Sequence, residues 1–520
     1  MQIAIDKINP GELILEARGI TKKFPGIVAN NNVNFNLRAG EIHVIVGENG
    51  AGKTTLMNIL YGLYKPDEGD IYIRGKKVDI KSPKDALRLS IGMVHQHNKL
   101  IPSHTVFENI IVGCSKVGKI IHRKELEEEL KELCDKYQFT LDFEAKIWQL
   151  SAGEKQLVEI VRILFRGAKI LILDEPTSVL TPEEMEVLMT SLKEMTKNEF
   201  AIIPFITHKI PVVLRMADRI TVLRKGEVVG TLNIEDATGD KLAEMMIGRK
   251  VLFRVQKPNI EKGKEILQVK GLSALNDRNV PAVRNVSFSI REGEIFGIAG
   301  VAGNGQNELV ETIVGLRKPT AGNIIFRGED ITNLSILDRR KRGMEYIPAD
   351  RVEIGSVGEF SLVENIAMNL YFDDNYKHRG IFDLDKIRKK TVKLISDFNV
   401  VTQNEDFKAK TLSGGNLQKL ILARSLSHDA KILVAELPTH GLDVGAIEFV
   451  RNQLIQAVKE KIGILFISQD LDEVLSMSDK IAPIYEGEFV DIIPAEKADR
   501  QMIGSMISGK QGGNRDETNT

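Results

Sequence analysis

Cysteine is scarce in this sequence: Cys114 and Cys134 are the only two among 520 residues. The pair has no metal-ligand spacing, and two cysteines cannot build a disulfide framework or a four-cysteine zinc site. We therefore expect two free thiols in a reducing compartment. The class of small disulfide-bonded secreted proteins is excluded.

Long apolar runs are also missing. No stretch approaches the roughly 18 consecutive apolar residues of a membrane-spanning helix. The first residues, 1–7, do not combine a basic region with an apolar one, as a signal peptide would. We expect a cytoplasmic protein, and any role at a membrane must then come through a partner.

The chain has almost no net charge. Lys and Arg number 71 and Asp and Glu number 72, so the formal net charge at pH 7 is −1. Binding to nucleic acid depends largely on clustered positive charge, so the composition gives no argument for a nucleic-acid partner. Its length requires about two to four domains, because a single hydrophobic core rarely grows so large.

One segment, residues 47–54, matches the phosphate-binding P-loop pattern G-x-x-x-x-G-K-[ST]. Apolar residues 42–46 precede it and predict a buried strand, while residues 55–60 predict a helix. Glycines let backbone N–H groups surround phosphate oxygens, and the helix N-terminus adds partial positive charge. We expect Lys53 to reach the β- and γ-phosphates and the Thr54 hydroxyl to bind Mg²⁺.

Candidate catalytic residues lie at the ends of two further predicted strands. Residues 169–173 are mainly apolar and lead into Asp174 and Glu175. Two adjacent carboxylates at the end of a buried strand need a reason, because burying charge is costly. Residues 200–206 form the second run, and His208 follows its end.

The pattern of the first half returns in the second half. Gly47 and Gly300, Ser151 and Ser413, and His208 and Gln469 are separated by nearly the same number of residues. A near-constant offset across several motifs indicates a duplicated domain. The predicted organisation is a first domain over residues 13–250, a linker over 251–265, a second domain over 266–507 and a disordered polar tail over 508–520.

Two copies of a P-loop, a Leu-Ser-x-Gly loop and an apolar strand with an Asp-Glu-Pro-like ending resemble the tandem ATP-binding subunit of an ABC transporter. The resemblance covers about residues 13–507. It is closer to the fused ATPases of ribose, galactose and nucleoside importers, whose second copy carries the run at 412–419. It implies an α/β fold of two tandem P-loop NTPase domains, each with a RecA-like core, a small antiparallel β subdomain and a helical subdomain.

The resemblance also implies an activity and partners. ATP and Mg²⁺ would be the cofactors, and ATP hydrolysis would be coupled to transport. The partners would be transmembrane permease subunits and, indirectly, an extracytoplasmic solute-binding lipoprotein, with no nucleic acid. The chain would then be a peripheral protein on the cytoplasmic face of the cell membrane.

In that family each ATP lies between the P-loop of one domain and the Leu-Ser-x-Gly loop of the other. In the first composite site, Lys53, Glu175 and His208 would be catalytic, with Glu175 orienting or deprotonating water. Thr54, Gln96 and Asp174 would position Mg²⁺. The residues expected around the nucleotide are Phe24, Gly47, Glu48, Asn49, Gly50, Ala51, Gly52, Lys53, Thr54, Thr55, Gln96, Ser413, Gly414, Gly415 and Asp443.

Some of these residues also have simpler interpretations. A phenylalanine such as Phe24 is more often a core residue than a platform for adenine, and a single histidine such as His208 is more often structural. Gln96 is assigned only by its spacing from the P-loop, with His95 and His97 on either side.

The second composite site departs from the family pattern at nearly every position. Its departures are Gln306 for lysine, Asn307 for Ser/Thr, Asp277 for the adenine aromatic, Glu436 and Leu437 for the two carboxylates, Gln469 for histidine, Ala152 for a glycine and Thr181 for the interface aspartate. Losing a positioned acid or base costs roughly 10²–10⁴-fold in rate. We therefore expect one hydrolytic site and one that does not hydrolyse ATP.

Three functions remain to be compared. The first is an importer ATPase for a nucleoside, favoured by the segments 94–97 and 100–102 and by the absence of an Asp-Glu pair in the second half. The second is an importer ATPase for a monosaccharide such as ribose or galactose. The third is a soluble twin ATPase acting on ribosomes or nucleic acid, which the short linker, the neutral charge and the degenerate second site disfavour.

Overall fold

The computed structural model describes residues 9–95, 99–114, 116–118, 121–174, 182–197, 200–206, 210–249, 260–378, 381–427 and 429–509. The chain divides into two compact units, residues 1–251 and residues 252–520. We call them the first and the second domain and describe each by itself. None of the described helices combines the length and apolar character needed to cross a bilayer.

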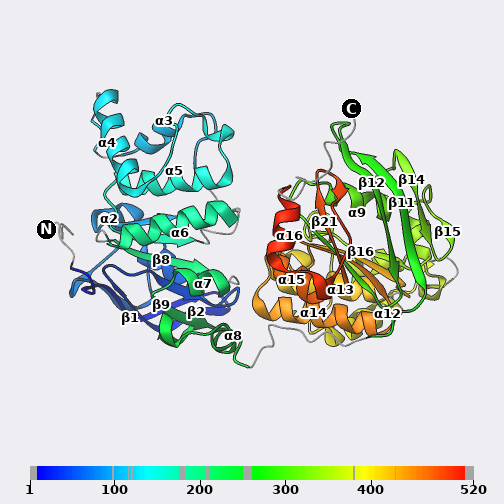
Figure 1. The fold of residues 1–520 in the computed structure, drawn as a ribbon. Coiled ribbons are helices and arrows are strands. Elements are labelled where there is room, and N and C mark those ends of the chain that lie inside the picture. The colour runs from blue at the N-terminus through cyan, green and yellow to red at the C-terminus, as the bar shows by residue number, and fades with distance from the viewer. Residues whose placement is uncertain are drawn as a thin grey trace, which may run out of the picture. The chain divides into compact units, whose positions relative to one another are not determined.

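The first domain contains a central sheet, a separate antiparallel sheet and a group of helices at the far end from that second sheet (Figure 1). In chain order its described strands and helices are β1 (Leu13–Phe24), β2 (Ile27–Arg38), β3 (His43–Val46), α1 (Lys53–Leu60), β4 (Glu68–Ile73), β5 (Lys76–Val78), α2 (Pro83–Arg88), β6 (Ile91–Val94), α3 (Val106–Ile111), α4 (Arg123–Tyr137), α5 (Ala152–Phe165), β7 (Ile170–Asp174), α6 (Pro182–Lys197), β8 (Ala201–Ile206), α7 (Ile210–Met216), β9 (Arg219–Arg224), β10 (Glu227–Asn233) and α8 (Gly239–Ile247).

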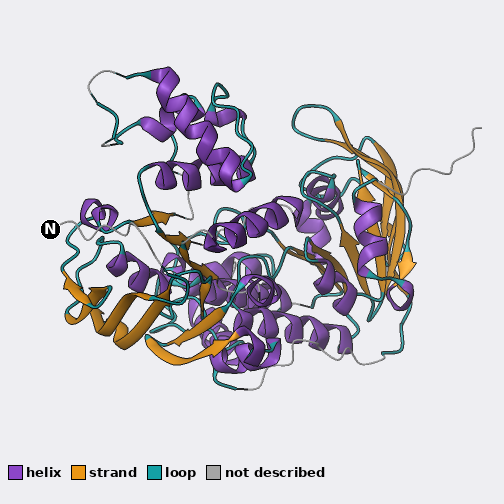
Figure 2. Ribbon diagram, turned by 60° about the vertical axis from the view of Figure 1, so that its left-hand side comes forward, coloured by secondary structure: helices purple, strands orange, loops and turns teal. Residues whose placement is uncertain are grey.

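A six-stranded sheet with the order β10-β9-β3-β8-β7-β6 forms the centre of the first domain. Its strands are parallel except for the β9–β10 hairpin. A separate antiparallel sheet has the order β2-β1-β4-β5. Helices α3, α4 and α5 lie at the opposite end of the domain from β1 and β2 (Figure 1). Figure 2 shows the same separation, with these helices at the top and orange strands at the lower left.

Side-chain alternation explains the antiparallel sheet. Along β2 the apolar residues Val33, Phe35 and Leu37 are buried, while the asparagines between them are exposed. Successive side chains of a strand point to opposite faces, so this period of two buries one face only. That face packs with β1 and α1 in one hydrophobic cluster. By contrast, all four residues of β3 are buried, as expected for a central parallel strand.

The second domain repeats this plan with small changes. Its described strands and helices are β11 (Glu265–Leu275), β12 (Pro281–Arg291), β13 (Ile295–Ala299), α9 (Gln306–Val314), β14 (Ala321–Phe326), β15 (Glu329–Asp330), α10 (Ile336–Lys341), β16 (Met344–Ile347), α11 (Leu362–Leu370), β17 (Lys377–His378), β18 (Ile381–Phe382), α12 (Leu384–Asp397), α13 (Gly414–Leu426), β19 (Ile432–Glu436), α14 (Val444–Lys459), β20 (Gly463–Ser468), α15 (Leu471–Met477), β21 (Lys480–Tyr485), β22 (Glu488–Phe489), β23 (Ile493–Pro494) and α16 (Arg500–Ile507).

Its central sheet runs β16-β19-β20-β13-β21-β22, with β23 also paired to β21, and its antiparallel sheet runs β12-β11-β14-β15. Longer connections account for the changing offset between the two halves. The loop from β16 to α11 spans residues 348–361, whereas its counterpart from β6 to α3 spans 95–105. The small β17–β18 hairpin adds further residues before α12.

The predicted α/β fold with two tandem P-loop domains is confirmed, and one strand was missed. No strand was predicted within residues 83–148, yet β6 forms a buried edge strand there and pairs with β7. Its four residues are too few for periodicity to separate a strand from a helix. Most of the predicted linker, residues 251–259, and most of the predicted tail, residues 510–520, lie outside the described residues.

Candidate functional site

The first P-loop connects β3 to α1 through glycines that no other residue can replace. Gly52 is the N-cap of α1 with φ 96°, in the left-handed region. A Cβ at Gly52 would lie 2.2 Å from the Ala29 carbonyl oxygen, and one at Gly47 would lie 2.3 Å from the Leu223 carbonyl oxygen. Because both neighbours are backbone atoms that cannot move aside, the loop needs glycine at both positions.

Lys53 is held inside the loop by the loop's own carbonyl groups. Its Nζ donates to the carbonyl oxygens of Gly47 at 2.7 Å and Glu48 at 2.8 Å, and the side chain is buried. A phosphate group could replace these neutral carbonyls as the acceptor, and its negative charge would strengthen the bonds from the ammonium group. The geometry therefore positions an ammonium group at a helix N-terminus, ready for an anion.

Two neighbouring segments support the loop from behind. Gly226, in the β9–β10 turn, donates its N–H to the Ala51 carbonyl oxygen at 3.1 Å. Asn31, on β2, donates its N–H to the Gly226 carbonyl oxygen at 2.8 Å. Asn30, also on β2, donates from Nδ2 to the Gly52 carbonyl oxygen at 3.1 Å. The loop is thus fastened to both sheets of the first domain.

Phe24 ends β1 and has an aromatic partner that the sequence reasoning missed. Its ring meets that of Tyr64 edge to face, with centroids 5.5 Å apart. Phe24 is only partly buried and Tyr64 is exposed, so the pair is not part of the hydrophobic core. Partly exposed rings of this kind can accept the flat face of a nucleobase.

The donor set expected for Mg²⁺ is described in part. Thr54 is exposed in the first turn of α1, and Asp174 is the last residue of β7. Both lie at or just beyond the carboxyl ends of strands in the same parallel sheet, the edge where ligands of such sheets bind. A hydroxyl and a carboxylate are hard oxygen ligands that fit Mg²⁺. Gln96, Glu175 and His208 lie outside the described residues, as does Thr181.

The second glycine loop keeps the backbone of the first but changes its side chains. Gly305 is the N-cap of α9 with φ 95°, and its Cβ would lie 2.0 Å from the Ala282 carbonyl oxygen. Gln306 occupies the place of Lys53 and donates from Nε2 to the Val301 carbonyl oxygen at 2.9 Å. The fold of the loop is therefore retained while its positive charge is lost.

The carboxylate position of the second domain is occupied by a hydrogen bond within the protein. Glu436 ends β19, as Asp174 ends β7, and is buried. Its Oε2 accepts from the Tyr346 hydroxyl at 2.5 Å and from the Ala349 N–H at 3.4 Å. Burial raises the pKa of Glu436, and burial also raises the pKa of Tyr346. A buried carboxyl already bonded in this way, without a hydroxyl at Asn307, does not fit Mg²⁺.

The aromatic pair of the first domain is replaced by an ion pair in the second. Asp277 stands in place of Phe24 and Arg317 in place of Tyr64, at the same offset. Arg317 donates from Nη2 to Asp277 at 2.8 Å and bonds Glu311 as well. These groups offer no flat apolar surface, so the second domain has no counterpart of the aromatic platform at these positions.

The two Leu-Ser-x-Gly loops differ in what their serines do. Ser151 caps α5, and its hydroxyl donates to Glu184 Oε1 at 3.0 Å while accepting from the Glu154 N–H at 3.1 Å. Ser413 caps α13, and its hydroxyl accepts from the N–H of Asn416 at 3.4 Å and from its Nδ2 at 3.0 Å. Among the residues that the structure describes, the Ser151 hydroxyl has an acceptor in its own domain and the Ser413 hydroxyl has none.

The other residues expected around the second Leu-Ser-x-Gly loop lie beside it. Gly414 and Gly415 form the first turn of α13, where backbone N–H groups have no partner within the helix. Asp443 is the N-cap of α14 and accepts from the Ala446 N–H at 2.8 Å. A Cβ added at Gly415 would lie 3.8 Å from Asp443 Oδ2. Asp443 therefore has a structural role as a helix cap, whatever else it contacts.

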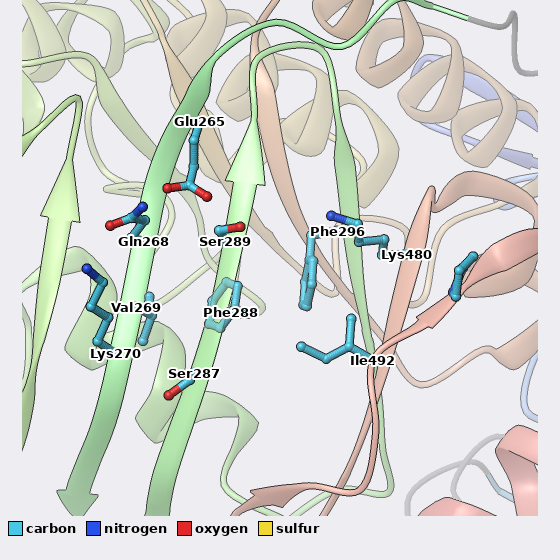
Figure 3. Close-up of a pocket in the computed structure, with 11 residues that line it drawn as sticks. Glu265, Gln268, Val269, Lys270, Ser287, Phe288, Ser289, Phe296, Lys480 and Ile492 are labelled. Atoms are coloured by element: carbon cyan, nitrogen blue, oxygen red, sulfur yellow. The ribbon is translucent and has the colours of Figure 1, made fainter.

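A cavity of about 430 Å³ lies in the second domain, away from its glycine loop. Figure 3 shows Ser287, Phe288 and Ser289 on one strand, across from Phe296, Lys480 and Ile492. Phe296 is near the start of β13, whereas the glycine loop follows its end. In the corresponding part of the first domain, Arg219 reaches across to the Asn36 carbonyl oxygen at 3.0 Å. The cavity is therefore not the nucleotide site. Lys480 stands where the first domain has the longer Arg219, and this difference helps to explain why a cavity is present in the second domain.

Three residues that line or support the nucleotide-binding positions were not predicted, although the repeat in the sequence could have indicated them. Tyr64 and Arg317 correspond at the offset that relates Phe24 to Asp277, so the paired exchange was visible in the sequence. Asn30 corresponds to Val283 at the same offset. Tyr346 gave no such signal, because its bond to Glu436 joins residues 90 positions apart.

Comparisons with known proteins agree with the repeated architecture. A sequence profile described as ABC transporter matches residues 30–178 and again residues 283–440. The guanosine import ATP-binding protein NupO of Bacillus subtilis is 43% identical over 500 residues, which is 96% of this chain and 98% of that protein. The glucose import ATP-binding protein TsgD13 of Haloferax volcanii is 43% identical over 529 residues, which is 96% of each.

Among solved structures, one titled RNase-L Inhibitor covers 94% of this chain and 92% of its own, with a TM-score of 0.63. The two sequences are 19% identical. At that identity the likeness concerns the fold alone.

Proposed function

This chain belongs to the ABC transporter family, and from that membership we propose that it is the ATP-binding and hydrolysing subunit of an importer. It would work with separate transmembrane permease subunits, and with an extracytoplasmic solute-binding protein acting through them. Its place would be the cytoplasmic face of the cell membrane. The transported solute is proposed to be a nucleoside, because the relative NupO is named a guanosine import ATP-binding protein.

The observation that carries this proposal is the first P-loop. Lys53 sits at the N-terminus of α1 with its ammonium group held by two loop carbonyls. An ATP β- or γ-phosphate would replace these carbonyls, and the first-turn N–H groups would contact the same phosphates. Phe24 and Tyr64 would contact the adenine.

We further propose that Thr54, Gln96 and Asp174 hold Mg²⁺, which would neutralise phosphate charge. Glu175, directly after Asp174, would orient or deprotonate the attacking water, and His208 would hold the γ-phosphate. Ser413, Gly414 and Gly415 are proposed to complete this site. The Ser413 hydroxyl accepts two bonds from Asn416, and its proton has no acceptor in the described part of the chain, which supports that role.

A monosaccharide is the second candidate solute, because the glucose import relative TsgD13 has the same 43% identity as NupO. The deciding experiment reconstitutes the chain with its permease and binding protein in proteoliposomes and measures ATP hydrolysis. Stimulation by a nucleoside but not by glucose, ribose or galactose is the expected result. Stimulation by a sugar alone would overturn the nucleoside assignment, and ATPase activity dependent on ribosomes would overturn the importer function.

A further inference from the structure

Asn30 is a buried polar residue directly behind the first P-loop. Its side chain is 0% exposed. Nδ2 donates to the Gly52 carbonyl oxygen at 3.1 Å. Its Oδ1 is buried as well and has no hydrogen-bond partner among the residues that the structure describes. The amide therefore makes one bond, and that bond goes to the P-loop.

Stability alone does not favour an asparagine here. Burying an amide with an unsatisfied oxygen is costly, whereas an apolar residue of similar volume carries no such cost. The second domain has such a residue, because Val283 lies at the corresponding place on β12 and is 1% exposed. An orphaned buried group calls for an explanation in function or in an unseen partner.

The bond to Gly52 acts on the direction of a neighbouring N–H group. The Gly52 carbonyl and the Lys53 N–H belong to one planar trans peptide unit, so they point in opposite directions. The Gly52 carbonyl also accepts from the Leu56 N–H at 3.0 Å, as the first bond of α1. With its carbonyl held by two donors, this peptide keeps the Lys53 N–H directed out of the helix N-terminus, toward a bound phosphate.

The second glycine loop is fastened by a different side chain. There Asn304 accepts at Oδ1 from the Glu486 N–H at 3.0 Å, which ties the loop to the β21–β22 turn. The first loop has Ala51 at that place. The backbone frames otherwise agree, since Gly487 donates to the Asn304 carbonyl oxygen at 3.1 Å just as Gly226 donates to Ala51. The backbone contact from β2 also has a counterpart, since Arg284 donates to the Gly487 carbonyl oxygen as Asn31 donates to that of Gly226. Only the side-chain contact of Asn30 is therefore particular to the loop that has the lysine.

We propose that Asn30 is a positioning residue for phosphate binding, which holds the Gly52–Lys53 peptide of the first P-loop in its anion-binding orientation. This inference rests on the proposed ATP-binding function of that loop. Because the residue costs stability while aiding ligand binding, its removal should weaken nucleotide binding without lowering stability.

The test measures ATP and ADP affinity by titration calorimetry on the full chain, together with the melting temperature without nucleotide. In the Asn30→Val variant, which copies Val283, ATP and ADP should both bind roughly 3- to 10-fold more weakly, the loss expected for one hydrogen bond. The melting temperature should stay the same or rise. The matched control, Val283→Asn, should lower the melting temperature and leave ATP affinity within about twofold.

Unchanged ATP affinity in Asn30→Val would overturn the proposal. Weaker binding together with a lower melting temperature would also overturn it, because general loosening of the domain would then explain both. If Val283→Asn weakened ATP binding as much as Asn30→Val does, the proposal would be overturned as well. If the unmodified chain bound neither nucleotide, the proposed function itself would fail, a result that is distinct from all of these.

Discussion

The two domains share a backbone plan but distribute their chemical groups in complementary ways. The first has a lysine in its glycine loop and an aromatic pair beside β1, yet the serine of its Leu-Ser-x-Gly loop is bonded to Glu184. The second has a glutamine, an ion pair and a glutamate bonded to Tyr346 at the corresponding positions, yet no described residue accepts the Ser413 hydroxyl proton. Duplication thus preserved the scaffold twice, while each half retained a different part of the chemistry.

The largest expected effect comes from the two carboxylate positions. Glu175→Gln should leave ATP binding intact and lower ATP hydrolysis by the assembled transporter by roughly 10²–10⁴-fold, because a positioned base is lost. Glu436→Gln should change hydrolysis by less than about twofold, since Glu436 is already engaged by Tyr346. Steady-state phosphate release measures both variants. Near-normal activity of Glu175→Gln would refute the assignment of the base, and a collapse in folded Glu436→Gln would show that the second domain takes part.

A smaller effect is expected from exchanging the loop residues. Lys53→Gln gives the first loop the side chain of the second, and ATP should bind roughly 10- to 100-fold more weakly because charge-assisted bonds are lost. Gln306→Lys is the matched variant, and it should leave the overall ATP affinity within about twofold. Calorimetric titration with ATP measures the affinity and the number of ATP molecules bound by each variant. A gain of a second ATP per chain in Gln306→Lys would mean that charge alone separates the loops.

The aromatic pair should contribute less than the lysine. Phe24→Ala should raise the KM for ATP by roughly tenfold, in line with the stacking energy of one base on one aromatic ring, and should leave kcat nearly unchanged. Asp277→Ala, at the corresponding place, should alter neither value. The same Phe24 variant tested with GTP serves as a check, because stacking depends little on which purine is bound. An unaltered KM would return Phe24 to a purely structural role.

The smallest effect concerns stability and belongs to the second domain alone. Burial raises the pKa of Glu345, on β16, to about 7 from its ordinary 4.5, although Arg340 lies 3.5 Å away. The folded state therefore binds the proton more tightly than the unfolded state, and stability is lost as pH rises toward and through 7. Glu345→Gln should remove this loss, so its free energy of unfolding relative to wild type should increase by about 2 kcal/mol between pH 5.5 and pH 8.

Urea unfolding at the two pH values measures this difference. Gly92 occupies the corresponding place in the first domain, where a Cβ would lie 2.1 Å from the Ile163 side chain. A titrating side chain does not fit at that place in the first domain. The pH-dependent difference between Glu345→Gln and wild type should therefore appear only in the unfolding transition of the second domain. A pH-independent difference would mean that Arg340 keeps Glu345 charged in the folded protein.

Local patterns were enough to predict part of this molecule. The P-loop and its flanking strand and helix follow from residues adjacent in sequence, and the tandem α/β fold follows from the repeat. The four-residue strand β6 did not emerge, because it is shorter than the window in which periodicity can be judged.

The remaining features depend on contacts between distant segments. The Tyr346–Glu436 bond and the Asn30–Gly52 bond each join elements that meet only after the sheets have formed. Composition gives no sign of such contacts. The substitution of Glu436 for aspartate was visible as a departure, but the tyrosine that occupies its carboxylate was not.

The hydrogen-bonded carboxyl group of Glu436 has a consequence for how the stability of each domain should depend on ATP. A ligand that binds only the folded state adds stability in proportion to its concentration. The first domain should gain such stability from ATP, so its rigidity should follow the ATP supply. The second domain carries its own hydrogen-bond partner for the buried carboxyl group and needs no metal or nucleotide to satisfy it. The stability of the first domain should therefore rise and fall with the ATP concentration, while the stability of the second domain should not depend on it.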